Sequence, residues 1–185
     1  MVPLSALWLP ILLSAVIVFA ASSIMHVLLR YHASDYRQLP DENQILATLR
    51  GAAPTPGLYL FPYILPKEMK SPAALEKYKQ GPVGRLTIIP SGPPAMPKYL
   101  VLWFLYCLII GFFVAYLTGH TVAPGSNYLA VFRVAGTAAF LAYGLGHLSD
   151  GIWKGQTWSA TSKEVIDGLV YGLLTAGTFG WLWPR

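Results

Sequence analysis

The feature that most constrains this chain is an apolar run from Tyr99 to Thr118 that contains no charged side chain. Crossing the ~30 Å hydrocarbon core of a bilayer takes about 20 helical residues. Three further segments are similarly long and apolar, about Val2–Leu29, Tyr128–His147 and Val165–Trp183. Because unpaired backbone groups are costly in lipid, each segment is expected to be helical. The sequence therefore predicts four transmembrane helices.

Composition also favours an integral membrane protein. Hydrophobic residues make up 55% of the 185 and charged residues only 11%, against about 25% charged in soluble domains. The net charge is +5, but the bases are not gathered on one helix or stripe, so no nucleic-acid partner is predicted. The single cysteine, Cys107, excludes an intramolecular disulfide. The predicted partner of the apolar surface is the lipid bilayer.

The basic residues predict the orientation of the spans. Nine lysines and arginines lie between the first and second apolar segments, whereas the next connection, GHTVAPGSN, holds none. Lys154 and Lys163 follow the third segment, and only Arg185 follows the fourth. Since cytoplasmic loops are enriched in Lys and Arg, the first and third connections are expected in the cytoplasm and both termini in the periplasm.

Residues 31–98 separate the first span (1–30) from the other three (99–185) and are predicted to fold. The stretches LPDENQILATLRG and KSPAALEKYKQG are typical of short helices, and PGLYLFP and GRLTIIP of strands. So short a segment cannot bury a large core. The expected fold is an all-α membrane protein with a small α+β cytoplasmic cap. Four apolar strand residues are expected to face inward, Leu58, Leu60, Leu86 and Ile88, and four lysines to meet lipid headgroups, Lys67, Lys70, Lys77 and Lys79.

Two ridges of small residues predict how the spans pack. One follows the fourth segment at four-residue spacing, Gly168, Gly172, Ala176 and Gly180, and the other follows the third, Ala138, Ala142 and Gly146. Helices in lipid associate through close backbone approach along such ridges. We expect the third and fourth spans to pair, and docking of another subunit stays open. Arg133, about six residues into the third segment, is an intramembrane charge with three open roles: snorkelling or a structural pair, a subunit contact, or a substrate anion.

The candidate functional cluster consists of four residues at the cytoplasmic helix ends: His26, His147, Asp150 and Asp167. A His–Asp set of this kind is competent for a metal or a proton relay. The structural alternative is that His147 and Asp150 are solvated in the headgroup region and that Asp167, in the first turn of its helix, complements the helix dipole. His32 and Asp35 lie beyond the expected end of the first span, where an interfacial anchor is favoured over a metal site. No metal or cofactor is predicted.

Three stretches carry a resemblance to a known family. They are ALWLPILLSAVIVFAASSIMH…YHASDYRQLPDE, KYKQGPVGRLTIIPSGPPAMPKYL and DGLVYGLLTAGTFGWLWPR. Together they resemble a family of small, uncharacterised bacterial membrane proteins along the whole chain. The resemblance implies a bacterial inner (cytoplasmic) membrane, and it brings no known activity, cofactor or catalytic residue.

Two functions follow as hypotheses. The first is a multi-pass membrane protein without catalysis of its own, an accessory or assembly subunit beside a larger membrane complex, and a homo-oligomer stays open. It is favoured by the small-residue ridge, the small cap and the lack of a convergent catalytic set. The alternative is a small transporter or membrane enzyme that uses His26, His147, Asp150 and Asp167.

Overall fold

The computed structural model describes all residues, 1–185. The chain forms two compact units. A helical bundle comprises residues 1–36 and 95–185, and a small α+β unit comprises residues 37–94. The α+β unit is shorter at both ends than the predicted 31–98, because residues 31–36 are bonded to the last helix and the second long helix begins at Met96.

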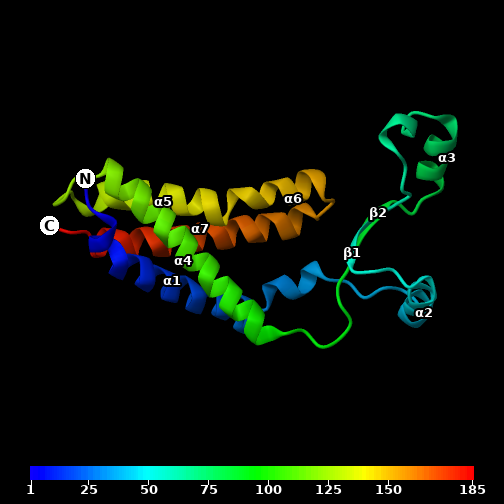
Figure 1. The fold of residues 1–185 in the computed structure, drawn as a ribbon, viewed down its shortest axis with the longest axis horizontal. Coiled ribbons are helices and arrows are strands. Elements are labelled where there is room, and N and C mark those ends of the chain that lie inside the picture. Colours follow the sequence, from blue (N-terminus) through cyan, green and yellow to red (C-terminus); the bar gives the residue numbers. More distant parts are fainter. The chain divides into compact units, whose positions relative to one another are not determined.

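The bundle contains four long helices, and Figure 1 shows them side by side. Helix α1 (Trp8–Ser23) is preceded by a 3₁₀ turn (Leu4–Leu7) and continued by a π-helical turn (Ile24–Leu28). Helix α4 (Met96–Thr121) follows the α+β unit. Helix α5 (Tyr128–Tyr143) leads through a 3₁₀ turn (Leu145–His147) into the short α6 (Leu148–Trp153), and α7 (Trp158–Trp181) ends the chain. Each long helix packs against two others, in the cyclic order α1, α4, α5, α7.

Both termini lie at the same end of the bundle, as Figure 1 shows. The Val2 amide donates to the Gly119 carbonyl at 2.8 Å, and the Gly125 amide donates to the Pro184 carbonyl at 2.9 Å. The indole of Trp183 donates to the Ala123 carbonyl at 2.9 Å. These bonds hold the two chain ends against the α4–α5 connection, so the helices run alternately away from and back to this end.

Three regions of the bundle are long and apolar enough to cross a membrane: Leu4–Leu28, Met96–Thr121 and Tyr128–Trp153. These regions make the chain a membrane protein with a helical membrane part. Their outward residues are apolar, as Ile109 (55% exposed) and Phe113 (63% exposed) illustrate. Helix α7 is not among the three. Four spans are therefore not confirmed. Glycines and threonines lower the hydropathy of α7, and Lys163, Glu164 and Asp167 charge its first half.

Helices α5 and α7 form the closest pair of the bundle. A Cβ added to Gly168 would overlap the backbone of Gly144, and one added to Gly172 would lie 3.1 Å from the Phe140 amide nitrogen. At Gly180 an added Cβ would lie 2.7 Å from the ring of Tyr128. The glycine ridge of α7 thus lies against α5 within the same chain, which is the arrangement that small residues permit in lipid.

The ridge expected on the facing helix differs by one position. Ala142 and Gly146 are exposed. The fully buried stripe of α5 is instead formed by Val131, Ala135 and Ala139, and it continues to the buried Tyr143. The sequence predicted the four-residue spacing of the buried positions correctly, but several neighbouring positions on α5 also hold small residues. Only the packing against α7 decides which of them face inward.

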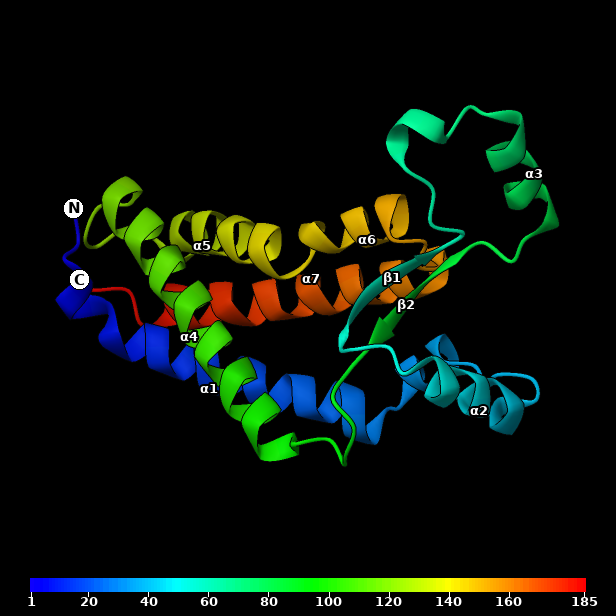
Figure 2. The same ribbon diagram turned by 45° about the vertical axis from the view of Figure 1, so that its right-hand side comes forward.

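The small unit contains the predicted order of helix, strand, helix and strand. Its elements are α2 (Glu42–Ala52), β1 (Gly57–Phe61), α3 (Pro72–Gln80) and β2 (Gly84–Ile88). The strands pair antiparallel with Tyr59 opposite Leu86, and Figure 2 shows the resulting two-stranded ribbon. As predicted, the Ser71 side chain caps α3 by accepting from the Ala74 amide at 3.2 Å, and Gly81 ends the helix with a φ of +56°.

The prediction that Leu58 and Leu60 face inward is wrong. These side chains are 60% and 50% exposed, whereas Leu86 and Ile88 are half-buried. Ala74 is the only residue of this unit that is fully buried. The physical reason is that a two-stranded sheet has no second layer, so its strands lack a surface against which to bury both faces.

Candidate functional site

The end of α1 positions the first functional side chains. The helix widens into the π-helical turn that contains His26, and such turns are frequent at functional sites. Arg30 then adopts a left-handed backbone conformation with φ 49°, which is uncommon outside glycine. The chain reverses there into a 3₁₀ turn, Tyr31–Asp35. This turn brings His32 and Asp35 back to the bundle.

Lys163 of α7 holds this turn in place. Its ammonium donates to the Tyr31 carbonyl at 2.9 Å, to the Ser34 hydroxyl at 2.7 Å and to Asp35 Oδ1 at 2.6 Å. The hydrogen bond from Lys163 holds the pKa of Asp35 below its usual value, and a hydrogen bond from His32 acts in the same direction. Asp35 is therefore a carboxylate at neutral pH.

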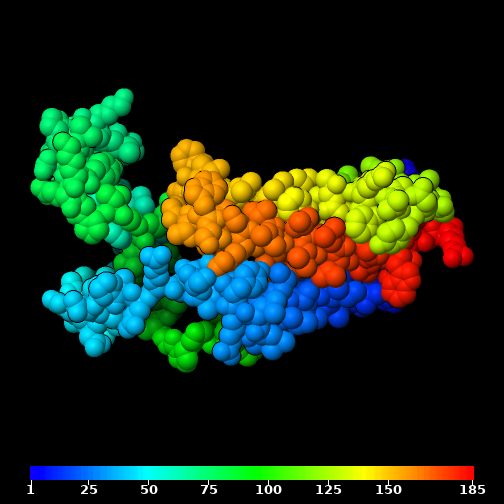
Figure 3. All heavy atoms as spheres, turned by 180° about the vertical axis from the view of Figure 1, so that it is seen from behind, coloured from blue at the N-terminus to red at the C-terminus, as the bar shows by residue number.

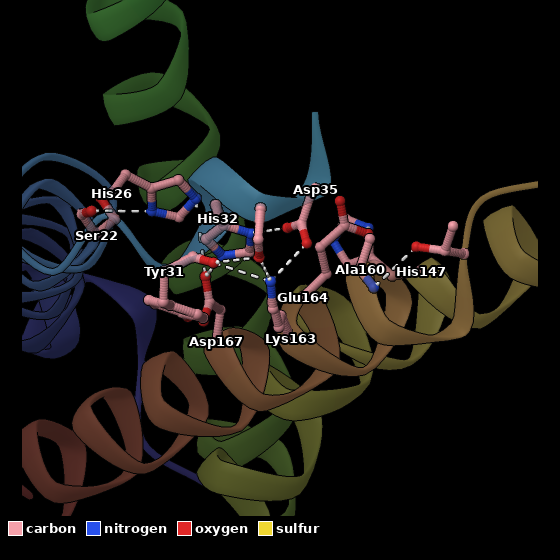
Figure 4. Close-up of polar contacts among 12 residues, drawn as sticks. Ser22, His26, Tyr31, His32, Asp35, His147, Ala160, Lys163, Glu164 and Asp167 are labelled. Carbon is pink, nitrogen blue, oxygen red and sulfur yellow. Dashed lines mark hydrogen bonds and ion pairs between the residues drawn. The ribbon is translucent and has the colours of Figure 1, made fainter. Parts of the chain in front are cut away.

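Three side chains from distant parts of the sequence meet beside this turn, and we call them the His26 cluster: His26, His32 and Asp167. Asp167 Oδ2 lies 3.0 Å from His32 Nε2 and 3.7 Å from His26 Nε2. The two imidazole rings stack with centroids 4.6 Å apart. Figure 4 shows the three side chains pointing toward one another, with Asp35 and Lys163 behind His32.

The position of Asp167 contradicts the structural alternative drawn from the sequence. Helix α7 begins at Trp158 and is capped by Thr157, so Asp167 lies in the third turn rather than the first. The predicted interaction of Asp167 with the helix dipole is therefore wrong, because this effect falls off within the first turn. Asp167 is 3% exposed and is the only charged residue among the buried residues. Its Oδ1 atom has no hydrogen-bond partner.

A second group, the His147 cluster, includes Glu164, one turn before Asp167 on α7, together with His147 and Asp150. His147 Nδ1 lies 3.2 Å from Glu164 Oε2, without hydrogen-bond geometry, and 3.8 Å from Asp150 Oδ2. Asp150 also pairs with Lys154. The carboxylates of this cluster are more exposed than Asp167, at 22% for Asp150 and 32% for Glu164 against 5%.

The four residues selected from the sequence thus fall into two pairs. His26 meets Asp167, and His147 meets Asp150. Sequence reasoning did not select His32 and Glu164, which complete the two clusters. A signal for His32 was present, because His32 and Asp35 are three residues apart and a single helical turn brings such residues together.

A cavity of about 690 Å³ adjoins both clusters. His26, His147, Glu164 and Asp167 line its polar end, and no lysine or arginine lines it. Its aromatic wall contains Trp103, Tyr106, Tyr143 and Tyr171, whose neighbouring rings lie 5.4 to 6.5 Å apart. The Trp103 indole donates to the Ser22 hydroxyl at 2.8 Å, which fixes this wall to α1. The Tyr171 hydroxyl is buried without a partner.

A second cavity, of about 840 Å³, also borders His26. Arg30, His32 and Asp35 line it, and His26 and Glu164 line both cavities. Figure 3 shows the face of the bundle on which α1, α6 and α7 lie side by side.

The remaining predicted residues belong to neither cluster. Arg133 occupies an exposed position on α5. The four lysines assigned to lipid headgroups, Lys67, Lys70, Lys77 and Lys79, are exposed in the α+β unit.

Each cluster offers three donor atoms that all lie within 4.8 Å of one another. Imidazole nitrogen and carboxylate oxygen are ligands that zinc and iron accept in proteins. Comparison with known proteins adds no assignment, since no family model, curated protein or solved structure matches this chain.

Proposed function

We propose that this protein binds a membrane-soluble amphiphile in the cavity beside the two clusters, as a small transporter or membrane enzyme. The observation that carries the proposal is the cavity itself. Its volume of about 690 Å³ falls in the range of ligand pockets, and its aromatic and aliphatic wall ends on a few convergent polar groups. An apolar chain would lie against Trp103 and Leu102, with its headgroup at Asp167.

The charge of the polar end selects the headgroup. Asp167 and Glu164 line it, and lysine and arginine are missing from the lining. Two buried oxygens at this end, Asp167 Oδ1 and the Tyr171 hydroxyl, have no protein partner. Unsatisfied buried polar atoms are costly and call for a partner. A headgroup that donates hydrogen bonds or carries positive charge, such as an amine or an alcohol, meets both conditions. An anionic headgroup does not.

The proposal includes four spans in a bacterial inner membrane. Helix α7 has 24 residues, so it is about 36 Å long, sufficient for a bilayer core. It returns the chain to the end of the bundle where the N-terminus lies. An even number of crossings and the distribution of Lys and Arg favour cytoplasmic first and third connections and periplasmic termini. The inner membrane follows from the resemblance of the sequence.

Ligand-dependent stabilisation tests the amphiphile. The purified full chain is melted in mild detergent with a long-chain alkyl amine, the matching alcohol or the matching carboxylate. A ligand at 100 times its dissociation constant stabilises the native state by about 2.7 kcal/mol. We expect the amine and the alcohol to raise the melting temperature. Leu102→Trp, which fills the cavity, should abolish the shift. Leu117→Trp is the control, because Leu117 is similarly exposed on α4 (44% against 51%) but does not line the cavity.

The proposal fails if Leu102→Trp responds to the amine as the unaltered chain does, or if the carboxylate stabilises as strongly as the amine. Asp167→Asn distinguishes the stabilisation contributed by the ligand's headgroup from that contributed by its alkyl chain. It should reduce the shift produced by the amine more than that produced by the alcohol, since only the amine carries a charge.

An accessory or assembly subunit is the second candidate, and one observation favours it. All residues of β1 are exposed, including Leu58, Tyr59, Leu60 and Phe61 at 36 to 60%. A lone two-stranded sheet is marginally stable, and its edges accept a further strand. A larger protein recovered in stoichiometric amount after gentle detergent extraction, and lost on Leu60→Lys, would support this function. Extraction of the chain alone would argue against it.

A further inference from the structure

We infer that the His26 cluster binds one divalent first-row transition-metal ion, with His26 Nε2, His32 Nε2 and Asp167 as its ligands. The inference goes beyond the amphiphile proposal and does not depend on it; where an ion compensates Asp167, Glu164 and the Tyr171 hydroxyl remain for the headgroup. It also departs from the sequence, which predicted no metal.

The tautomers of both histidines favour a cation. His26 Nδ1 lies 3.1 Å from the Ser22 carbonyl oxygen, and His32 Nδ1 lies 2.8 Å from Asp35 Oδ2. Both partners are acceptors, so each Nδ1 carries a proton, and in the neutral tautomer each Nε2 then presents a lone pair. A backbone carbonyl or a carboxylate on the second nitrogen is the arrangement found around metal-binding histidines. Lys163 completes it by holding Asp35.

The two Nε2 atoms lie near the same carboxylate oxygen. His32 Nε2 and His26 Nε2 lie 3.0 and 3.7 Å from Asp167 Oδ2. Zinc–nitrogen and zinc–oxygen bonds of about 2.0–2.1 Å in a tetrahedral site place neighbouring donors roughly 3.3 Å apart. The observed distances bracket this value. Two like lone pairs and a carboxylate oxygen at such spacing need a positive charge among them, which is either a proton on His32 Nε2, hydrogen-bonded to Asp167 Oδ2, or a metal ion.

The burial of Asp167 is an independent observation. Its side chain is 5% exposed, and its Oδ1 atom is buried without a partner. Lys163 already pairs with Asp35, so with both imidazoles in the neutral form the cluster of Asp167, His26 and His32 carries a net negative charge. A buried charge of this kind is costly unless it is paired or coordinates a metal. A metal ion compensates the carboxylate, and Oδ1 is available as a further ligand atom.

The His147 cluster is less suited to a metal. Lys154 already pairs with Asp150, and the Glu164 side chain is 32% exposed, against 5% for Asp167. A metal there would have to displace an ammonium group. We therefore assign one ion to the chain. Since His26 and Asp167 line the aromatic cavity, the open coordination positions of that ion would face it.

Titration with cobalt(II) tests the inference. The full chain is purified in mild detergent, treated with a chelator and titrated with Co²⁺, whose visible absorption reports nitrogen and oxygen ligands. We expect one Co²⁺ per chain, displaced by Zn²⁺. His32→Ala and Asp167→Asn should abolish this binding. Asp35→Asn, which removes the partner of His32, should weaken it about 10–100-fold.

Two histidines outside the cluster supply controls. His120 is exposed on α4 and bonds only the Tyr116 carbonyl, at 2.7 Å, so His120→Ala should bind Co²⁺ as the unaltered chain does. His147→Ala should also retain binding. Thermal melting with and without Zn²⁺ is recorded for each variant, so that loss of folding is distinguished from loss of a ligand.

Three results would overturn the assignment. They are no Co²⁺ binding by the unaltered chain, equal loss in His32→Ala and His120→Ala, or binding that His147→Ala removes and a folded His32→Ala retains. If the chain binds no Co²⁺, a proton shared between His32 and Asp167 is the positive charge of the cluster. None of them would affect the response to alkyl amines that tests the amphiphile.

Discussion

The contact between α5 and α7 makes a graded prediction about glycine substitutions. Gly168, Gly172 and Gly146 differ in how much space an added methyl group would find. At Gly168 it would lie 2.5 Å from the Gly144 nitrogen and 2.7 Å from the Tyr143 carbonyl carbon, and at Gly172 it would lie 3.1–3.2 Å from atoms of Phe140. At Gly146 no atom lies within 4 Å of it.

These distances set the expected cost. Alanine at Gly168 would meet backbone atoms that no side-chain rotation can move, so the helices must separate by roughly 1 Å, enough to forfeit a quarter to a half of the dispersion energy of the affected contacts. Overpacking costs typically about 1–3 kcal/mol. We expect the cost of Gly168→Ala to lie at the upper end of this range and that of Gly172→Ala at the lower end. Gly146→Ala should change the free energy of unfolding by less than about 0.5 kcal/mol.

Reversible unfolding in mixed micelles, with the denaturing detergent as the variable, measures these differences. The three variants share one type of substitution, and Gly168 and Gly172 share one helix, so differences in intrinsic helix propensity largely cancel between these two, whereas Gly146 lies in the 3₁₀ turn after α5. Equal stability of Gly168→Ala and Gly146→Ala would refute the close approach of α5 and α7. A cost at Gly172 greater than that at Gly168 would refute the relative placement of the two helices.

Two further predictions concern the turn after α1 and the orientation of the spans. Lys163→Met should speed amide hydrogen exchange in residues 31–35, because three hydrogen bonds to this turn are lost, whereas Lys154→Met, which breaks an exposed pair with Asp150, should leave that exchange unchanged. In a cysteine-free background, a cysteine at Lys77 should react with an impermeant thiol reagent only from the cytoplasmic side, and one at Ser126 only from the periplasmic side. The opposite labelling would invert the proposed topology.

Much of the secondary structure was predictable because it depends on local chemistry. Helix α4 contains the uncharged run of Tyr99–Thr118 and extends it by three residues at each end. The order of elements in residues 37–94 followed from turn residues and caps, including Ser71 and Gly81. In each case the signal lies within a few residues of the structure that it specifies. Local signals of this kind do not depend on the rest of the fold.

The sequence alone determined the apolar segments, the glycine ridge and the residue types available for a site. Only the tertiary structure decided which of these residues meet. Asp167 meets His32 across 135 positions of sequence, and no local pattern encodes that distance. Helix α7 begins at Trp158, before the predicted span, so Asp167 lies in its third turn inside the bundle. The chain reverses at Arg30, and His32 therefore lies against the bundle again. Periodicity assigns a residue to one face of its own helix, whereas packing between helices decides what that face meets.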